Sequence, residues 1–411
     1  MDTIAEPERK IPVSGRYDVL VGGGGVAGIG AAVAAARNQA KILLIERYGY
    51  LGGLATGGLV LPLPVPPKGS PRGHGGIMQE VIDRLEGAGE LCRTQSGDCF
   101  SNPEAIKLVC QEILEESDVE LLLDTLVVGA IKDGYTVRGV IAENKSGRQA
   151  ILAKVTVDAT GDADIAALAG APFMKRSREE MLPITMMYVV GNVDEEKFRE
   201  YETKDPGLRK ASEKAGFIYS SWLGGKVQRG PSMRHMSGLM KGMMLVWGGA
   251  VKYDGSNAKE LTSAWLELRK QVAAEVAFLR RYVPGFESCH IIQTSPYVGV
   301  RETRRIVGEY VLTEDELKGK RFEDTVFYNG TYDLCIPYRS LVPKKIDNLL
   351  AAGRCVYAGE TGRGIISCMA MGQAAGTAAA LSAKTGVKPR DLDVKALKKT
   401  LCEQSFCVDR E

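Results

Sequence analysis

Apolar and small residues near the start of the chain follow a pattern that predicts a strand, a turn, a helix and a second strand. Residues 18–21 form a short apolar run without alternation, which is typical of a parallel strand covered on both faces. A run of glycines follows, then a helix of small residues over 30–36. A second apolar strand over 41–45 ends at Glu46. The whole unit spans residues 17–46.

Scaffold helices, short strands and one proline-rich stretch come next. Residues 77–85 carry apolar residues at helical spacing, and Asn102 and Pro103 mark the start of another helix. Turn sequences separate three predicted strands over 119–128, 139–143 and 150–157. The third strand runs into the sequence DATGD, where backbone can approach a ligand closely. The proline-rich stretch 61–76 predicts a surface loop or lid.

The pattern of small-residue strands and helices gives way to a different composition in the middle of the chain and returns near its end. From about residue 175 to 332 it predicts methionine-rich strands, a polar helix over 258–281 and a charged strand over 301–313. A buried strand over 346–355 and a small-residue helix that ends at Gly386 follow. The fold class is therefore α/β, with a discontinuous nucleotide-binding domain over 16–175 and 336–390. We expect a mixed α+β cap or substrate domain over 176–335, a flexible N-terminal extension over 1–15 and a C-terminal tail over 391–411.

The glycine run fits the dinucleotide-binding pattern G-x-G-x-x-G. In this register Gly23 permits the tight turn, Gly25 lets the backbone approach a pyrophosphate, and Gly28 lets the helix pack closely on the strand. The phosphates would lie at the helix N-terminus. Glu46 would accept hydrogen bonds from a ribose 2′-hydroxyl and repel a 2′-phosphate, which disfavours NADP. A purely structural glycine turn is the alternative, although strand, spacing, helix and acid all agree with a nucleotide site.

Composition narrows the class of partner. The net charge of +2 is small and the basic residues are dispersed, so we expect a small-molecule partner and no nucleic acid. The polar N-terminal segment does not resemble a signal peptide, and no apolar run is long enough to span a membrane, so we expect a soluble, cytoplasmic protein. The nine cysteines include no C-x-x-C pair, which argues against a disulfide framework and a metal site. Cys289 and His290 are neighbours, and neighbours on a strand point to opposite faces.

Four separated motifs carry a resemblance to a known family. They are VGGGGVAGIGAA with LIERYGYLGGLAT, DATGDADIA, VGVRETRRIVGEYVLT, and LVPKKIDNLLAAGRC with CMAMGQAAGTAAA. Together they resemble the FAD-dependent oxidoreductases with a two-dinucleotide-binding flavoprotein fold, which are related more distantly to fumarate reductase flavoproteins. The resemblance implies FAD as the cofactor and a Rossmann-like FAD-binding domain of the glutathione reductase type. It also implies hydride transfer between bound flavin and a small organic substrate.

The resemblance also implies which residues hold FAD. Glycines 23, 25 and 28 would hold the pyrophosphate, Glu46 the adenosine ribose, and the backbone of Val127 the adenine. The set implied to hold the cofactor is Gly23, Gly25, Val26, Ala27, Gly28, Glu46, Arg47, Gly52, Gly53, Leu54, Ala55, Thr56, Val127, Ala159, Thr160, Gly161, Asp162, Gly353, Arg354, Ile365, Cys368 and Met369.

The last helix is implied to point its N-terminus, over 364–369, at the pyrimidine edge of the flavin. A helix N-terminus stabilises negative charge by about 0.3 to 2 kcal/mol, so the protein would raise the flavin potential. Two positions depart from the family pattern. Val26 stands where a proline is common, and GRGIISCM stands where an Arg-Val-Met-Pro motif is usual, so the active-site roles there do not transfer directly; Arg363 is the arginine nearest to that motif.

The candidates for catalysis lie mainly in the middle of the chain. His235 can move a proton near neutral pH, and its alternative is a solvent-facing or hydrogen-bonded histidine. Arg301 and Arg304 can clamp a carboxylate, and their alternative is a structural ion pair with Glu302 and Glu309. His74, at the end of the proline-rich loop, is the third candidate.

A set of methionines near His235 suits an apolar or aromatic substrate and suits core packing equally well. This set consists of Met233, Met236, Met240, Met243 and Met244.

Two other functions use the same glycine motif. One is an NAD-dependent dehydrogenase. The other is an FAD-dependent RNA-modifying or scaffold protein, which predicts a basic face that the balanced charge does not provide. The chain has no second G-x-G-x-x-G unit, so it carries no nicotinamide domain of its own and the electron donor or acceptor is undetermined. The oligomeric state, including a homo-oligomer, is also left open.

Overall fold

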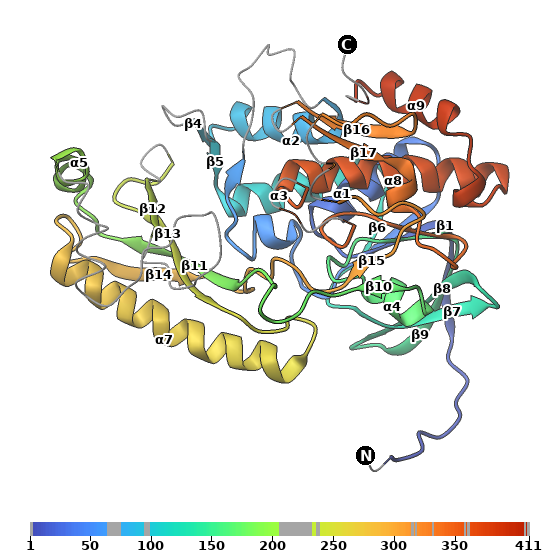
Figure 1. Cartoon of the computed structure of the whole chain (residues 1–411), viewed down its shortest axis with the longest axis horizontal. Helices are drawn as coiled ribbons and strands as arrows, with labels where there is room; N and C mark the ends of the chain where they lie inside the picture. Colours follow the sequence, from blue (N-terminus) through green and yellow to red (C-terminus); the bar gives the residue numbers. More distant parts are fainter. Residues whose placement is uncertain are drawn as a thin grey trace.

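The computed structural model describes residues 3–63, 75–93, 99–204, 232–235, 239–313, 316, 319–330, 333–356, 359, 362–406 and 408. These residues form two lobes (Figure 1). The larger lobe holds a seven-stranded sheet with helices α1 (Val26–Arg37) and α8 (Ile365–Thr385), and the smaller holds a four-stranded sheet and the long helix α7 (Ala258–Tyr282). We call them the nucleotide lobe and the cap lobe.

The sheet of the nucleotide lobe joins parallel strands to an antiparallel meander. Its strand order is β6 (Glu120–Leu122), β2 (Ile42–Ile45), β1 (Val13–Gly22), β9 (Gly147–Asp158), β8 (Thr136–Asn144) and β7 (Leu126–Asp133), and β18 (Leu349–Ala351) also pairs with β9. Strands β6, β2, β1, β9 and β18 are parallel, whereas β9, β8 and β7 are antiparallel. Val19, Leu20 and Val21 are fully buried, as expected for a strand covered on both faces. The strand-turn-helix-strand unit predicted over 17–46 is confirmed.

Helices α1 and α8 pack backbone to backbone. A Cβ atom on Gly372 would lie 2.0 Å from the carbonyl oxygen of Ala27, and one on Gly376 would lie 2.0 Å from that of Ala31. Any side chain at these positions would push the helices apart, which explains why both helices consist of small residues. The predicted helix end is confirmed, because Gly386 adopts a left-handed φ of 73° just after Thr385.

Helix α8 is long and apolar enough to cross a membrane by length and composition, and it is the one such helix in the described part of the chain. Its most apolar stretch is 89% buried inside the protein, as in the core helix of a globular protein.

The remaining elements surround the nucleotide lobe. They are η1 (Gly53–Ala55), β3 (Pro62–Leu63), α2 (Gly76–Gly87), β4 (Leu91–Arg93), β5 (Cys99–Ser101), α3 (Pro103–Glu116), α4 (Asp164–Ala169), β10 (Phe173–Met174), β15 (Arg305–Ile306), β16 (Thr325–Asn329), β17 (Leu334–Pro337), η3 (Tyr338–Leu341), η4 (Pro389–Asp391) and α9 (Val394–Glu403). The predicted start of α3 is confirmed: the side chain of Asn102 accepts a hydrogen bond from the N–H of Glu104.

Three strand predictions are wrong in extent, and one of them, the buried strand predicted over 346–355, is only the three residues of β18. The single strand predicted over 119–128 is two strands, β6 and β7, because the chain turns at Asp124, which has a φ of 48°. The strand predicted over 301–313 is reduced to the two residues of β15. Its charged side chains instead bond to neighbouring loops and to α4, as described below.

The cap lobe is an antiparallel sheet between two layers. Its order is β12 (Ser232–His235), β13 (Met244–Val251), β11 (Ile184–Gly191) and β14 (His290–Thr294), and α5 (Glu195–Lys204) follows β11. Side chains alternate along β11: Met186 and Tyr188 pack with α7, whereas Met187 and Val189 face a small apolar cluster toward the nucleotide lobe. All eight residues of β11 are therefore buried. Cys289 is buried and His290 is exposed, which agrees with the expected opposite orientation.

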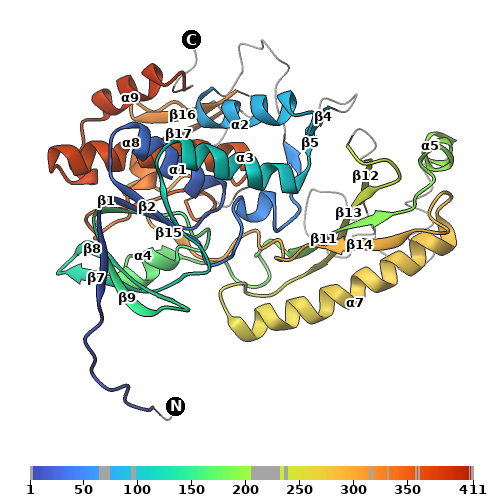
Figure 2. The same cartoon turned by 180° about the vertical axis from the view of Figure 1, so that it is seen from behind.

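The expected domain boundaries stay a prediction, and the core clusters suggest a narrower cap. The core of the cap lobe runs from Ile184 to Val300. Apolar residues of β15, β16 and β17 belong instead to the core of the nucleotide lobe, as do Leu397 and Leu401 of α9 in the expected tail. We propose a cap of about residues 184–300. Strand β1 begins at Val13, and the residues before it extend away from the body (Figure 2).

Candidate functional site

A cavity of about 410 Å³ lies where the two lobes meet. Its wall in the nucleotide lobe, here called the nucleotide wall, consists of Gly23, Gly25, Val26, Ala27, Glu46, Arg47, Tyr48, Tyr50, Gly53, Leu54, Ala55, Val60, Phe100, Ala159, Thr160, Gly161, Ala352, Gly353, Arg354, Arg363, Gly364, Ile365 and Cys368. The opposite wall, here called the cap wall, consists of Thr185, Met187, Trp247, Tyr297, Gly299, Val300 and Arg301.

The glycine turn brings a free helix N-terminus to this cavity. Gly23 has a φ of 103°, and a Cβ atom there would lie 2.4 Å from the carbonyl oxygen of Ala159, so only glycine fits. Helix α1 begins after Gly25 without a side-chain cap and without an acidic residue in its first turn. Its first N–H groups therefore favour an anion at the cavity surface.

Glu46 lies at the end of β2, beside the turn. Its Oε2 accepts a 2.6 Å hydrogen bond from the N–H of Gly24, and its Oε1 accepts one of 3.0 Å from the N–H of Tyr48. Burial raises the pKa of Glu46, and these N–H donors offset part of the rise. The carboxylate thus fixes the turn while lining the cavity.

Two tyrosines contact Arg47, and a third stacks on one of them. The guanidinium lies 4.9 Å from the ring centre of Tyr48 and 5.0 Å from that of Tyr297, and it donates a 2.6 Å hydrogen bond to the Tyr297 hydroxyl. Tyr48 also stacks on Tyr50, with ring centres 5.2 Å apart. Because Tyr297 belongs to the cap wall, this contact ties the two walls together.

A buried ion pair joins Arg354 of the nucleotide wall to Asp162, which does not line the cavity. Arg354 donates a 2.6 Å hydrogen bond to Asp162, and Thr303 donates another to the same carboxylate. Burial alone would raise the pKa of Asp162, but Arg354, Thr303 and Arg47 outweigh it and hold the pKa below its usual range. The same pairing raises the pKa of Arg354 despite its burial. Both groups therefore stay charged beside the cavity.

A second buried carboxylate, Asp158, shapes the DATGD turn. It accepts hydrogen bonds from the N–H and hydroxyl of Thr160 and from the N–H of Ala166. Burial still raises its pKa to about 6. Asp158 does not line the cavity, so its role is to hold the turn that carries Ala159, Thr160 and Gly161.

The N-terminus of α8 forms the far end of the nucleotide wall. The helix starts after Gly364 without a side-chain cap or an acidic residue in its first turn. Burial raises the pKa of the Cys368 thiol to about 12, so the cysteine is a neutral wall residue.

Most residues that sequence analysis assigned to the cofactor line this one cavity. They are Gly23, Gly25, Val26, Ala27, Glu46, Arg47, Gly53, Leu54, Ala55, Ala159, Thr160, Gly161, Gly353, Arg354, Ile365 and Cys368. Their contacts with a cofactor stay a prediction.

Six assigned residues lie outside the lining. Val127 lies within β7, opposite Ala142, while the segment that contacts Glu46 is at Thr125, whose N–H donates to the Glu46 carbonyl. Asp162 lies behind Arg354.

The other four serve packing and turn geometry. A Cβ atom on Gly28 would lie 1.7 Å from the carbonyl oxygen of Gly23, and the Met369 carbonyl lies against Gly30 in the crossing of α1 and α8. The N–H of Gly52 donates to the Gly24 carbonyl, and the hydroxyl of Thr56 to the Leu51 carbonyl.

The catalytic candidates separate in space. Arg301 lines the cavity and is 9% exposed. Arg304 does not line it: its guanidinium donates to the Asp162 carbonyl and to the Asp164 carboxylate, so it makes a structural ion pair, but with Asp164 in place of the expected Glu302 and Glu309. The backbone of His235 pairs with Met244 in the cap sheet, but its side chain, like the whole of His74, lies outside the described residues.

Sequence analysis missed most of the cap wall. Thr185 and Met187 come from β11 and Trp247 from β13, where nothing local distinguishes them from the neighbouring strand residues. Tyr48 and Tyr50 carried a usable signal, since they follow Glu46 directly. Of the predicted methionine set, Met240 and Met243 join the apolar cluster between the lobes, Met244 packs in the cap core, and Met236 and the side chain of Met233 lie outside the described residues.

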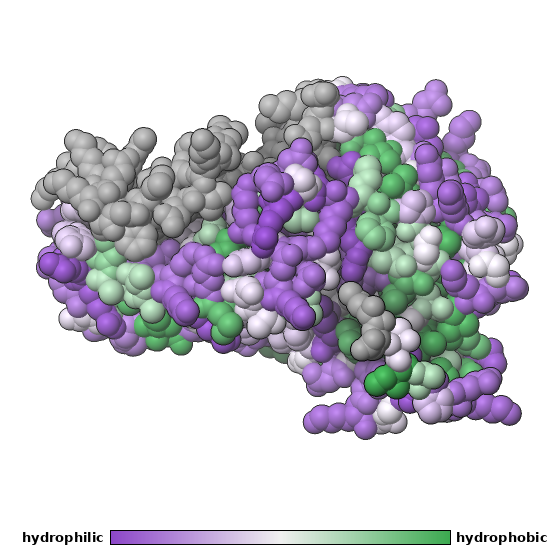
Figure 3. All heavy atoms as spheres, turned by 60° about the horizontal axis from the view of Figure 1, so that its bottom comes forward, coloured by the Kyte–Doolittle hydropathy of each residue, from purple (hydrophilic) through white to green (hydrophobic). Residues whose placement is uncertain are grey.

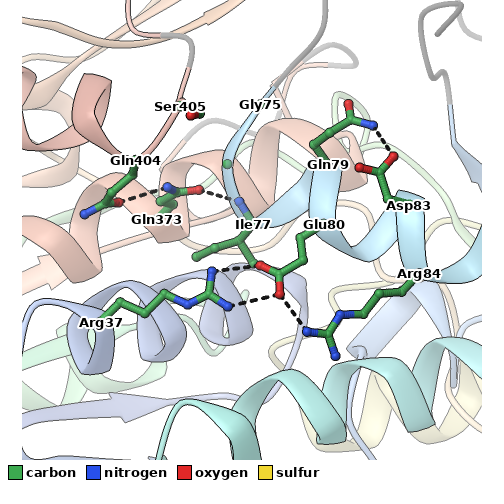
Figure 4. A pocket seen from close by; sticks show the side chains of 11 residues that line it. Arg37, Gly75, Ile77, Gln79, Glu80, Asp83, Arg84, Gln373, Gln404 and Ser405 are labelled. Carbon is green, nitrogen blue, oxygen red and sulfur yellow. Dashed lines mark hydrogen bonds and ion pairs between the residues drawn. The ribbon is translucent and has the colours of Figure 1, made fainter.

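A second, more open cavity of about 640 Å³ lies beyond α1 and α2 (Figure 4). Its polar side chains bond to each other: Glu80 accepts from Arg37 and Arg84, and Gln373 donates to Gln404 while accepting from the N–H of Ile77. None of the predicted site residues that the structure describes lines it.

Comparison with protein families decides the class of the protein. The family model for FAD dependent oxidoreductase matches residues 18–334 and 325–401. The chain belongs to the FAD-dependent oxidoreductase family. It is therefore an FAD-dependent enzyme, and FAD is its cofactor.

Solved structures share the fold. A geranylgeranyl bacteriochlorophyll reductase-like protein from Thermoplasma acidophilum is 16% identical, with a TM-score of 0.53, over 95% of this chain and 84% of that one. The p-nitrophenol 4-monooxygenase from Pseudomonas putida is 12% identical, with a TM-score of 0.50, over 94% of this chain and 83% of that one. At such identities the likeness shows the fold alone. No curated protein matches the sequence.

The cavity fits FAD chemically. Two uncapped helix N-termini, at Gly25 and Gly364, face it, and each favours negative charge. Glu46 supplies a carboxylate beside the turn for a ribose hydroxyl. Gly25 has open space where its Cβ would be, because the nearest atom there is the Cα of Gly53 at 3.8 Å. The residues present are those that a dinucleotide requires.

Proposed function

We propose that this enzyme transfers a hydride between FAD and a small organic substrate that lies against the cap wall, as a dehydrogenase or a reductase. The supporting observation is that one cavity joins the cofactor residues to side chains of the cap sheet. When bound there, FAD would accept or donate the hydride, so the chain itself needs to bind, orient and shield the substrate.

The cap wall offers groups for these tasks. Arg301 can clamp a carboxylate of the substrate through two parallel hydrogen bonds, and the Thr185 hydroxyl can contribute a further polar contact. Met187, Trp247 and Val300 exclude water from the same space. The proton donor or acceptor stays assigned to His235 as a prediction. We also propose that the substrate is a small molecule and that a separate partner donates or accepts the electrons.

An anaerobic absorbance experiment tests this function. The holoprotein is mixed with NADH, NADPH, hydroxy acids, sugars and aromatic compounds, and bleaching of the visible flavin band is followed. We expect one class of organic compound to bleach the oxidised flavin or to reoxidise the reduced flavin. Arg301→Lys should weaken the binding of a carboxylate substrate about tenfold and leave the FAD content unchanged, because it replaces a bidentate contact with a single charge. A retained flavin whose redox state no organic compound changes would contradict the proposal.

A further inference from the structure

Two residues of the cap wall, Met187 and Trp247, belong to an apolar layer that reaches the cavity. Its core is an apolar cluster that lies between the lobes and contains Leu59, Leu61, Phe100, Met187, Val189 and Leu245, with Trp247 packed against it. Four members of this apolar layer, namely Val60, Phe100, Met187 and Trp247, also line the cavity. An apolar surface thus continues from the junction of the lobes into the site.

Strand geometry separates the cavity residues from their neighbours. Met187 and Val189 lie two residues apart on the same face of β11, and Met187 pairs with Trp247 across to β13. Met187 reaches the cavity, whereas Val189 does not. Met187 and Val189 therefore share a strand, a face and an apolar cluster, but only Met187 contacts the cavity.

Most of the charged residues that line the cavity belong to the nucleotide wall, namely Glu46, Arg47, Arg354 and Arg363. Arg47 and Arg354 belong to the nucleotide wall and are bonded to Tyr297 and Asp162. Among the described residues of the cap wall, Arg301 alone is charged. A substrate that touches Met187 and Trp247 therefore meets an apolar thioether and an indole ring, which prefer an apolar partner.

We propose that Met187 and Trp247 determine substrate specificity and select a molecule with an apolar chain or ring of several carbons. This inference rests on the proposed function, since it assumes that the substrate occupies this cavity. A purely polar substrate, such as a sugar, would leave its hydroxyl groups unpaired against both side chains.

Binding of two homologous probe series tests the proposal without turnover. The probes are acetate, butanoate, hexanoate and octanoate, and the matching straight-chain alcohols. They are titrated into the oxidised holoprotein, and perturbation of the flavin absorption is measured. Each buried methylene should tighten binding about two- to fourfold, because its transfer from water is worth roughly 0.8 kcal/mol at most. A dependence on chain length in either series supports the proposal. Equal affinity along both series, or no response to any probe, overturns it.

Matched variants locate the effect. Met187→Gln keeps the length of the side chain but makes it polar, so it should flatten the dependence on chain length. Val189→Thr is the control on the same strand and face, and it should keep that dependence. Met187→Leu should restore it, and Trp247→Phe should reduce it only partly. FAD content, read from the visible absorbance per protein, should be unchanged in all four. An equal loss in the Val189→Thr control would overturn the assignment of Met187.

The outcome is distinguishable from failure of the proposed function. Hydride transfer is judged by a change in flavin redox state, whereas this test uses probes that leave the flavin oxidised. Affinity that rises with chain length without any redox substrate would refute the function alone. A redox substrate together with no dependence on chain length would refute this inference alone.

Discussion

The two walls of the cavity are built by different means. The nucleotide wall is built largely from turns and helix N-termini whose shape depends on glycines such as Gly23 and Gly53. The cap wall consists of side chains on a sheet, Met187 and Trp247, which come from strands far apart in the sequence. A wall of backbone tolerates almost no added atom, whereas a wall of side chains can change its specificity by substitution. We therefore expect cofactor binding and substrate selection to be separable.

The lobes also bury carboxylates in opposite ways. In the nucleotide lobe Asp162 is paired with Arg354 and keeps its charge, with a pKa below its usual range. In the cap lobe Glu275 of α7 is 1% exposed, and burial raises its pKa to about 8, although Tyr188 offsets part of the rise. The charge beside the cavity is thus compensated, whereas the charge within the cap core is suppressed.

On the α7 side of the cap, hydrophilic and hydrophobic residues are interspersed (Figure 3).

The largest expected effect is on the glycine turn. Gly28→Ala should abolish FAD retention and destabilise the fold, because the new Cβ would lie 1.7 Å from the Gly23 carbonyl oxygen. FAD content after gentle purification and the thermal midpoint measure both losses. Gly87→Ala is the control, since nothing lies within 4 Å of a Cβ atom there. A Gly28→Ala protein that retains FAD would contradict this prediction, because it would show that the glycine turn can shift to accommodate the added Cβ atom.

The second effect separates a buried from a partly buried ion pair. Arg354→Ala should lower the free energy of unfolding by about 3 to 5 kcal/mol, because it leaves Asp162 charged and buried. Arg304→Ala removes the partner of the half-exposed Asp164 and should cost about 1 kcal/mol or less through that pair. Urea denaturation of both variants at neutral pH gives the two values. Equal costs would contradict the distinction.

The last effect is a pH dependence of stability that originates in the cap and accumulates over several pH units. Because the folded pKa of Glu275 lies above its unfolded value, its contribution to stability is fully present below the unfolded pKa. That contribution is lost as the pH rises from the unfolded value to about 8. The loss is at most about 1.4 kcal/mol per pH unit. Glu275→Gln should remove this slope, which urea denaturation between mildly acidic and mildly alkaline pH would show. An unchanged slope would exclude Glu275 as its source.

Local patterns predicted the nucleotide wall well. The spacing of Gly23, Gly25 and Gly28, with an acid at Glu46, describes consecutive backbone geometry, so the sequence carries it directly. The resemblance added the DATGD turn and the last helix. The adenine contact at Val127 stays a prediction; Val127 lies in β7, which the turn at Asp124 separates from β6.

The cap wall could not be predicted in this way. Met187 and Trp247 face the cavity only because β11 and β13 pair and because a second lobe packs beneath them. Arg301 and Arg304 looked equivalent in the sequence, yet one lines the cavity and the other bonds to α4. The arrangement of two lobes, which no local spacing encodes, decides these roles.

The separation of the two walls is tested most directly by measuring FAD content and probe binding side by side in Glu46→Ala and Met187→Gln. Glu46→Ala should weaken FAD retention about tenfold or more with the fold intact, since it removes hydrogen bonds to a charged group. Met187→Gln should retain FAD fully and lose the dependence of binding on the chain length of the probe. If Met187→Gln loses FAD as Glu46→Ala does, or if Glu46→Ala retains it unchanged, the assignment of cofactor and substrate to separate walls is wrong.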